Sequence, residues 1–146
     1  MALWTTYLAF LRKVNWNPCN VFPDELEETI FLYVMRNRGN DEVAPSDDWW
    51  KPFKKLAKVY PIEELWEHYE DNYLLQIGLS KDAINWMQNT AYTSKRANIV
   101  LICYEKNAQY CHRRLLAEEL ARRFGADYRG ELNSSHLKKS GGGGTK

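Results

Sequence analysis

The clearest signal of the fold lies in Ile99–Leu116, IVLICYEKNAQYCHRRLL. It begins with an uninterrupted apolar run over 99–102, which is typical of a strand buried on both faces of a parallel sheet. A polar loop follows, and Leu116 and Leu120 then continue a helical spacing that ends at Gly125, a residue that often stops a helix. The order strand, loop, helix is the repeating unit of an α/β sheet. The sequence therefore predicts a small Rossmann-like α/β domain with a mostly parallel sheet flanked by helices.

Other segments fit this plan. Residues 28–35 (ETIFLYVM) are apolar without alternation, which favours a strand covered on both faces, although a buried helix turn fits as well. Helices are predicted from Pro61 to Gly78 and after Ser80, which suits an N-cap. A short strand within 128–132 would complete the unit. The segment Asn37–Pro52 is rich in turn-forming residues and is predicted to be a long loop.

The domain organisation follows from length and composition. We expect a single α/β domain over residues 1–132, because this length can bury a core without disulfides or metals. Residues 133–146 lose apolar periodicity and contain four consecutive glycines, so we expect a flexible tail.

The charge and the cysteines narrow the classes of function. Twenty Lys and Arg residues almost cancel nineteen Asp and Glu residues, so any attraction to anions must come from local clustering. No run of about 18 apolar residues and no basic leader stands in the chain, and a cytoplasmic protein without membrane partners is expected. Cys19, Cys103 and Cys111 form no C-x-x-C pair, which argues against a disulfide framework and a zinc site. No cofactor or metal is implied.

The predicted helix start at Cys111 breaks a local rule. Helix N-termini favour acids, yet His112, Arg113 and Arg114 stand in the first turn. A bound anion, phosphate or carboxylate, would explain this choice, and Arg113 is the preferred anchor because a guanidinium binds such groups in bidentate fashion. A structural salt bridge is the alternative for Arg113.

Chemistry at the same position could come from Cys111. A thiol at a helix N-terminus beside Arg and His should have a lowered pKa and could act as a nucleophile, although free cysteines more often simply pack. His112 could transfer a proton, bind phosphate or cap the loop. Glu105 could hold His112 or Arg113 in place, whereas Cys103 lies within the apolar strand and is interpreted as core.

The segment LICYEKNAQYCHRRLLAEEL resembles the signature of the domain-of-unknown-function family 488 (DUF488), in its branch with a strand of type L-C-x-E followed by a C-H-R helix start. The segments LWTTYLAFLRKV and FLYVMRNRG are similar to other parts of that family. The resemblance implies a Rossmann-like domain and supplies no reaction. It also implies a pocket formed by Thr6, Tyr7, Arg36, Glu105, Cys111, His112 and Arg113.

Two functions remain open at this point. The first is an enzyme or binding domain for a phosphorylated small molecule, a nucleotide or a nucleic-acid end, with Cys111, His112 and Glu105 as catalytic candidates and Arg113 among the anion contacts. The second is a non-catalytic module that binds protein or nucleic acid through the basic cluster and the loop carrying Trp49 and Trp50. A purely structural polar network at the helix start is the simplest alternative.

Overall fold

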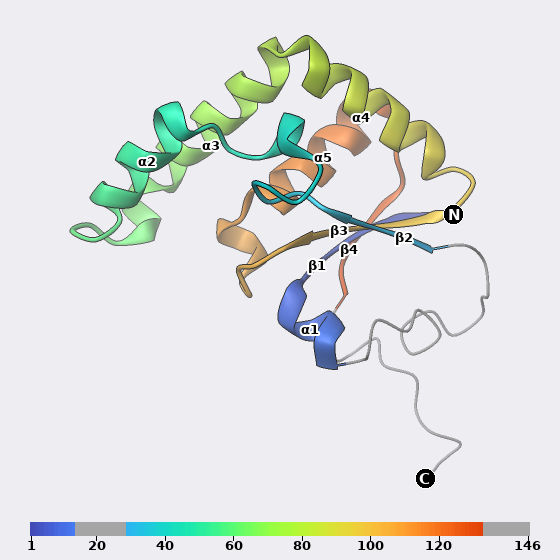
Figure 1. Ribbon diagram of the computed structural model, residues 1–146, viewed down its shortest axis with the longest axis horizontal. Coiled ribbons are helices and arrows are strands. Elements are labelled where there is room, and N and C mark those ends of the chain that lie inside the picture. Colours follow the sequence, from blue (N-terminus) through green and yellow to red (C-terminus); the bar gives the residue numbers. More distant parts are fainter. Residues whose placement is uncertain (14–28, 133–146) are drawn as a thin grey trace, which may run out of the picture.

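The computed structural model describes residues 1–13 and 29–132 (Figure 1). Its centre is a four-stranded sheet in the order β2-β3-β1-β4, and all neighbouring strands pair in parallel. The strands are β1 (Leu3–Tyr7), β2 (Thr29–Tyr33), β3 (Asn98–Cys103) and β4 (Tyr128–Glu131). The predicted α/β class with a parallel sheet is confirmed.

The most buried strand is β3, as its apolar run predicts. All six of its residues are buried, and it lies between β1 and β2 with Ile99 in register with both Leu3 and Ile30. In contrast, β2 is an edge strand whose residues are all only partly buried. The strand predicted within 28–35 is present, and its burial is only partial, because an edge strand has a neighbouring strand on one side only.

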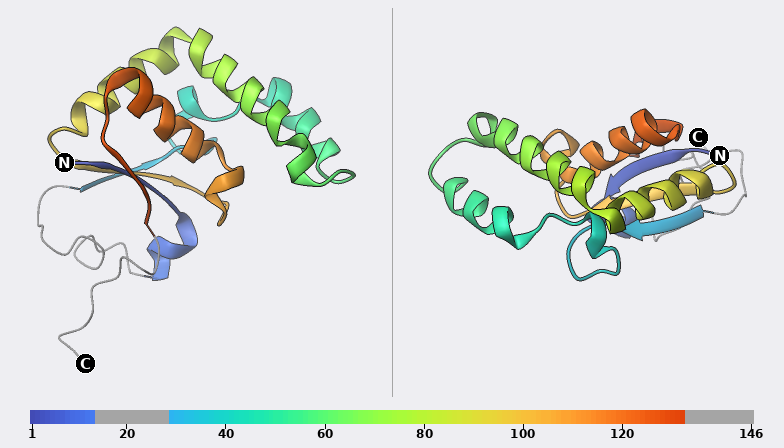
Figure 2. Two further views of the ribbon diagram at one scale, coloured as in Figure 1. Left: turned by 180° about the vertical axis from the view of Figure 1, so that it is seen from behind. Right: turned by 90° about the horizontal axis from the view of Figure 1, so that it is seen from above.

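Three long helices cover one face of the sheet, as Figures 1 and 2 show. They are α3 (Ile62–Leu79), α4 (Lys81–Thr93) and α5 (His112–Phe124), and the short α1 (Leu8–Lys13) follows β1 on the other side. Ser80 caps α4 as predicted, with its Oγ accepting from Ala83 N at 3.1 Å. Gly125 ends α5 in the left-handed conformation at φ 75°, which glycine adopts without strain.

The predicted long loop at 37–52 contains helical structure. A 3₁₀ turn, η2 (Asp41–Val43), and the helix α2 (Asp47–Leu56) occupy much of it. Ser46 caps α2 by accepting from Asp48 N at 3.3 Å, and the two acids Asp47 and Asp48 stand where the helix dipole favours them. The prediction is wrong because Ser and Asp serve both turns and helix starts, so their local composition does not separate the two.

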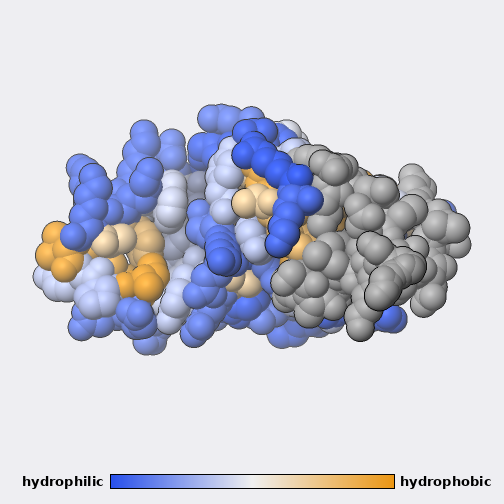
Figure 3. Space-filling view, turned by 90° about the horizontal axis from the view of Figure 1, so that it is seen from below, coloured by the Kyte–Doolittle hydropathy of each residue, from blue (hydrophilic) through white to orange (hydrophobic). Residues whose placement is uncertain are grey.

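Apolar side chains are exposed at the turn between α2 and α3. Leu56 and Val59 are exposed there, and Figure 3 shows apolar side chains at that end of the molecule. Within the described part of the chain, no helix is both long and apolar enough to cross a membrane. The predicted tail and Cys19 lie outside the described residues.

Candidate functional site

The candidate site lies where β2 and β3 end. Val34 to Arg36 continue from β2, and Glu105 follows two residues after the end of β3. A short 3₁₀ turn, η3 (Ala108–Tyr110), then leads to Cys111, the N-cap residue of α5. The carboxyl ends of parallel strands and the helix start that follows them are the usual position of ligand sites in α/β sheets.

Two thiols, an imidazole and a carboxylate meet at this position. The Sγ atoms of Cys103 and Cys111 lie 3.8 and 4.0 Å from Nδ1 of His112. The same two Sγ atoms lie 3.4 and 3.3 Å from Oε1 of Glu105. We call Cys103, Glu105, Cys111 and His112 the thiol–imidazole cluster. Its two cysteines and its histidine are at most 3% exposed, so this polar chemistry sits inside the protein.

The orientation of His112 is fixed by contacts on its other side. Its Nε2 lies 2.7 Å from the carbonyl oxygen of Val34, and a carbonyl can only accept, so Nε2 carries a proton. The ring of Tyr73 packs edge-on against the imidazole at 5.4 Å. Tyr73 in turn donates its hydroxyl hydrogen to Val43 O at 2.7 Å. Nδ1 is thereby aimed at the two sulfur atoms.

The electrostatics separate the two thiols. Burial acts to raise the pKa of Cys111, but hydrogen bonds from Cys103 and His112 and the charges of His112 and Arg113 hold it well below its ordinary value. The hydrogen bond to Cys111 raises the pKa of Cys103, and burial adds to this. Burial also raises the pKa of Glu105. Perturbed groups of this kind are typical of functional sites.

His112 is balanced between two effects. Burial lowers its pKa, whereas the hydrogen bond and charge of Cys111 raise it, and the pKa ends above the ordinary histidine value. Cys111 and His112 therefore favour the same charged pair, a thiolate beside an imidazolium, when nothing else binds to them.

A cavity of about 170 Å³ opens onto this cluster. Arg36, Trp50 and Tyr69 line it, together with three members of the cluster. The complete lining is Met35, Arg36, Pro45, Trp50, Tyr69, Cys103, Tyr104, Glu105 and His112. The cavity thus joins aromatic walls, a cation and the thiol–imidazole cluster.

Arg36 is the cation at this cavity. Its Nη2 donates to the carbonyl of Pro45 at 2.5 Å, and its Nε lies 3.5 Å from Oδ1 of Asp47. Nε is buried and makes no hydrogen bond to any residue that the structure describes. The guanidinium is about a third exposed, so it can still meet a ligand in the cavity. Of the expected anion contacts, Arg36 is the one that lines the cavity.

Arg113 departs from its expected role as the anion anchor. Its side chain is fully buried, and it pairs with Glu131 through Nε at 3.1 and 3.2 Å and through Nη2 at 2.5 Å. Nη1 donates to the carbonyl of Glu105 at 2.5 Å. All three nitrogens therefore have acceptors within the chain, and Arg113 is absent from the lining of the cavity. The geometry of Arg113 is that of a structural salt bridge, the alternative considered for this residue. Its hydrogen bond to the carbonyl of Glu105 also holds the loop between β3 and α5 in place.

Thr6 and Tyr7 also stand away from the cavity lining. Thr6 is buried and donates its hydroxyl hydrogen to the carbonyl of Leu132 at 2.9 Å, which ties the end of β4 to β1. Tyr7 is in register with Cys103, but its ring packs against Phe10 at 6.1 Å. Both residues, expected in the pocket from the family resemblance, serve the sheet in this structure.

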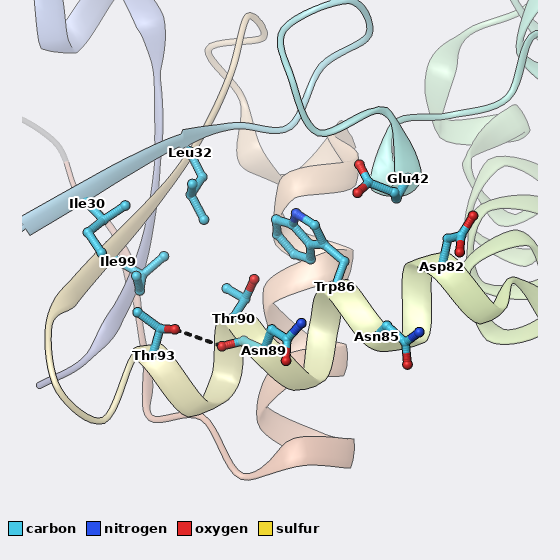
Figure 4. A pocket seen from close by; sticks show the side chains of 10 residues that line it. All are labelled: Ile30, Leu32, Glu42, Asp82, Asn85, Trp86, Asn89, Thr90, Thr93 and Ile99. Carbon is cyan, nitrogen blue, oxygen red and sulfur yellow. Dashed lines mark hydrogen bonds between the residues drawn. The ribbon is translucent and has the colours of Figure 1, made fainter.

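A second, larger cavity lies between β2 and α4 (Figure 4). Its volume is about 530 Å³, and Trp86 and Thr90 of α4 face Ile30 and Leu32 of β2 across it. The complete lining is Ile30, Leu32, Glu42, Asp82, Asn85, Trp86, Asn89, Thr90, Thr93 and Ile99. It contains neither a thiol nor an imidazole nor a guanidinium. The smaller cavity is the better candidate because chemistry-bearing groups converge there.

The Trp-rich segment is packed inward. Trp49 and Trp50 both meet the ring of Tyr69 edge-on, at 5.1 and 5.8 Å, and Nε1 of Trp49 donates to Oε1 of Gln76 at 2.8 Å. Arg114 forms an i,i+4 pair with Glu118. These side chains therefore do not form the expected interaction surface of exposed tryptophans and a free basic cluster.

Sequence reasoning missed three residues of the site. Cys103 was interpreted as core, and it is buried as expected, but its sulfur belongs to the thiol–imidazole cluster. Its place as the last residue of the strand, two positions before Glu105, could have signalled this. Trp50, which was expected on an interaction surface, and Tyr69 line the cavity through packing between α2 and α3, and no local pattern marks them as parts of this site.

Comparison with known proteins identifies the family of this chain. The chain matches the family model DUF488-N3a, described as the active DUF488-N3 subclade, over residues 23–124. This range includes Arg36, all four members of the thiol–imidazole cluster and Arg113. No curated protein and no solved structure matches the chain. Since the matched range exceeds half of the sequence and carries the site, the chain belongs to the DUF488 family.

Proposed function

We propose that this domain is an enzyme that binds a small phosphate-bearing molecule, of the nucleotide type, in the cavity beside the thiol–imidazole cluster. The observation that carries the proposal is the meeting of Arg36, Glu105 and His112 at one cavity at the carboxyl ends of β2 and β3. A cation that can bind an anion and groups that can transfer protons are then within one ligand's reach. The description of the matched subclade as active supports a catalytic role.

The size of the cavity limits what enters it. Its volume of about 170 Å³ is below the range of roughly 300–1,000 Å³ found for pockets that enclose a drug-sized ligand. A single phosphate group or one aromatic ring fits, while the rest of a nucleotide extends outward. Trp50 and Tyr69 line this cavity, so an aromatic ring that entered it would pack against their side chains.

Arg36 is assigned to the anion. About a third of the Arg36 side chain is exposed, so its guanidinium can meet a phosphate oxygen, whereas the side chain of Arg113 is fully buried against Glu131. A hydrogen bond between charged groups contributes about 1.5–3 kcal/mol, so its loss should weaken binding by roughly tenfold or more.

The experiment is a titration of the full chain with inorganic phosphate and with nucleoside monophosphates, followed by thermal shift and calorimetry. We expect both ligands to stabilise the wild type and Arg36→Gln to weaken their binding at least tenfold. Arg129→Gln is the matched control, because Arg129 is an exposed arginine that pairs with Asp127. Arg36→Lys should retain part of the affinity through its charge.

Two results would count against the proposal. One is a wild type that neither phosphate nor any nucleotide stabilises. The other is an equal response of Arg36→Gln and Arg129→Gln, which would mean that the anion binds elsewhere. Urea unfolding of Arg36→Gln without ligand checks that the variant folds, since its guanidinium also holds the carbonyl of Pro45.

A further inference from the structure

The thiol–imidazole cluster has the composition and spacing of a metal centre. One nitrogen and two sulfur donors, from His112, Cys103 and Cys111, all lie within 4.8 Å of one another and are buried. Thiolate and imidazole ligands of this kind suit Zn²⁺ among the common divalent ions. The two cysteines are eight positions apart in the sequence, and only the packing of α5 onto the end of β3 brings them together.

The distances can be compared with those of a tetrahedral centre. Bond lengths of about 2.3 Å to sulfur and about 2.0–2.1 Å to nitrogen or oxygen place neighbouring ligand atoms roughly 3.5–3.8 Å apart around a tetrahedral ion. The sulfur-to-Nδ1 distances here are 3.8 and 4.0 Å, and the sulfur-to-Oε1 distances are 3.4 and 3.3 Å. The sulfur-to-Nδ1 distances are within a few tenths of an ångström of that spacing, and Oε1 of Glu105 lies near the place of a fourth ligand. The two sulfur atoms lie within 4.8 Å of each other and would draw together around the ion.

The orientation of His112 is a second, independent observation. Its Nε2 is committed to the carbonyl of Val34 at 2.7 Å, which leaves Nδ1 with its lone pair directed at the two sulfurs when the ring is neutral. Metal-binding histidines commonly use one ring nitrogen for the ion and give the other to a backbone carbonyl. Arg113 holds the backbone at Glu105 in place, because its Nη1 donates to the carbonyl of that residue.

We propose that Cys103, Cys111 and His112 bind a Zn²⁺ ion, and that Glu105 faces the fourth position of that ion. The cavity reaches Cys103, Glu105 and His112, so the fourth position is open toward the ligand site. Three protein ligands and one open position are the arrangement of catalytic rather than structural zinc, which binds a water and lowers its pKa. A zinc ion on Nδ1 of His112 would leave Glu105 as the proton-transferring group of the proposed function, because Nε2 is committed to Val34. Metal binding can be tested without the phosphate ligand.

The experiment measures metal directly on the full chain. We expect purified wild type to retain about one zinc ion per chain by elemental analysis. Protein stripped by a chelator and reloaded with Co²⁺ should show a tetrahedral visible spectrum and a sulfur-to-cobalt charge-transfer band. Cys103→Ser and Cys111→Ser should each lose zinc and about half of that band. Cys19→Ser is the matched control and should keep both signals.

The readout stays decisive if a serine variant fails to fold, because the spectrum of the wild type alone counts the thiolate ligands. Co²⁺ bound without the charge-transfer band would overturn the assignment, as would equal loss of metal in Cys19→Ser. A reduced wild type that retains no zinc and binds neither ion would also overturn it, as would a metal-free protein in which Cys103 and Cys111 are joined as a disulfide. Failure of the phosphate titration would leave this result unaffected, so the two proposals fail separately.

Discussion

The buried ion pair between Arg113 and Glu131 gives a quantitative prediction about stability. Arg113 is fully buried, Glu131 is about a fifth exposed, and three nitrogen-to-oxygen contacts of 2.5–3.2 Å join them. Glu131→Gln preserves the shape of the side chain but removes its charge. The guanidinium then stays buried without a counter-ion, which is the costly way to break such a pair.

The magnitude follows from the contacts. Hydrogen bonds to a charged partner contribute about 1.5–3 kcal/mol, against about 0.5–1.5 kcal/mol for neutral pairs, so two bonded nitrogens lose roughly 2–3 kcal/mol together. Removing one member of a buried pair typically costs about 3–5 kcal/mol. The partial exposure of Glu131 and the carbonyls that still accept from Arg113 place the value at the lower end, about 3 kcal/mol.

The assay is urea unfolding of wild type and variant, with the free energy of unfolding extrapolated to water. Glu118→Gln is the control, because Glu118 pairs with Arg114 on the surface of α5 and is half exposed. Such a pair contributes about 0.3–0.5 kcal/mol. If Glu131→Gln lowers the free energy of unfolding no more than Glu118→Gln does, Arg113 is not buried against this carboxylate. Arg113 would then be available to bind an anion.

Four further substitutions test local features of the fold. Gly125→Ala should lower the free energy of unfolding by about 1 kcal/mol because φ is positive there. Gly78→Ala, within α3, should raise it by about 0.5–1 kcal/mol. An added Cβ meets no atom within 4 Å at either glycine, so shifts of the same sign in thermal unfolding would contradict the backbone argument. Ser80→Ala should cost about 1 kcal/mol in urea unfolding through loss of the α4 cap, and an unchanged midpoint would show that the cap contributes nothing. Burial raises the pKa of Tyr128 above 10.0 in the folded state, so its ionisation in the unfolded state should reduce stability as the pH rises past 10.0. Tyr128→Phe should weaken that decline in unfolding measured across this range, and an identical decline in both proteins would refute it.

Local sequence patterns were enough to predict the frame of the domain and the place of its candidate site. The apolar run at 99–102 needs no partner to be recognised as a buried strand, because a strand covered on both faces has no polar position. The helical spacing after Cys111 and the stop at Gly125 are equally local. These patterns, with the glutamate and the C-H-R sequence between them, predicted a functional edge where β3 ends and α5 begins.

Only the tertiary structure decided which side chains face one another at that edge. The direction of Arg113 toward Glu131 depends on β4 lying beside β1, and the orientation of His112 depends on Val34 at the end of β2. The sheet order that supplies these partners is a property of the whole chain. The identity of an arginine or histidine in a sequence does not indicate which distant residue will form its hydrogen bond or ion pair. Cys103 shows the same limit. Its burial was predicted from the apolar strand, but its contact with His112 arises only because α5 packs against β3.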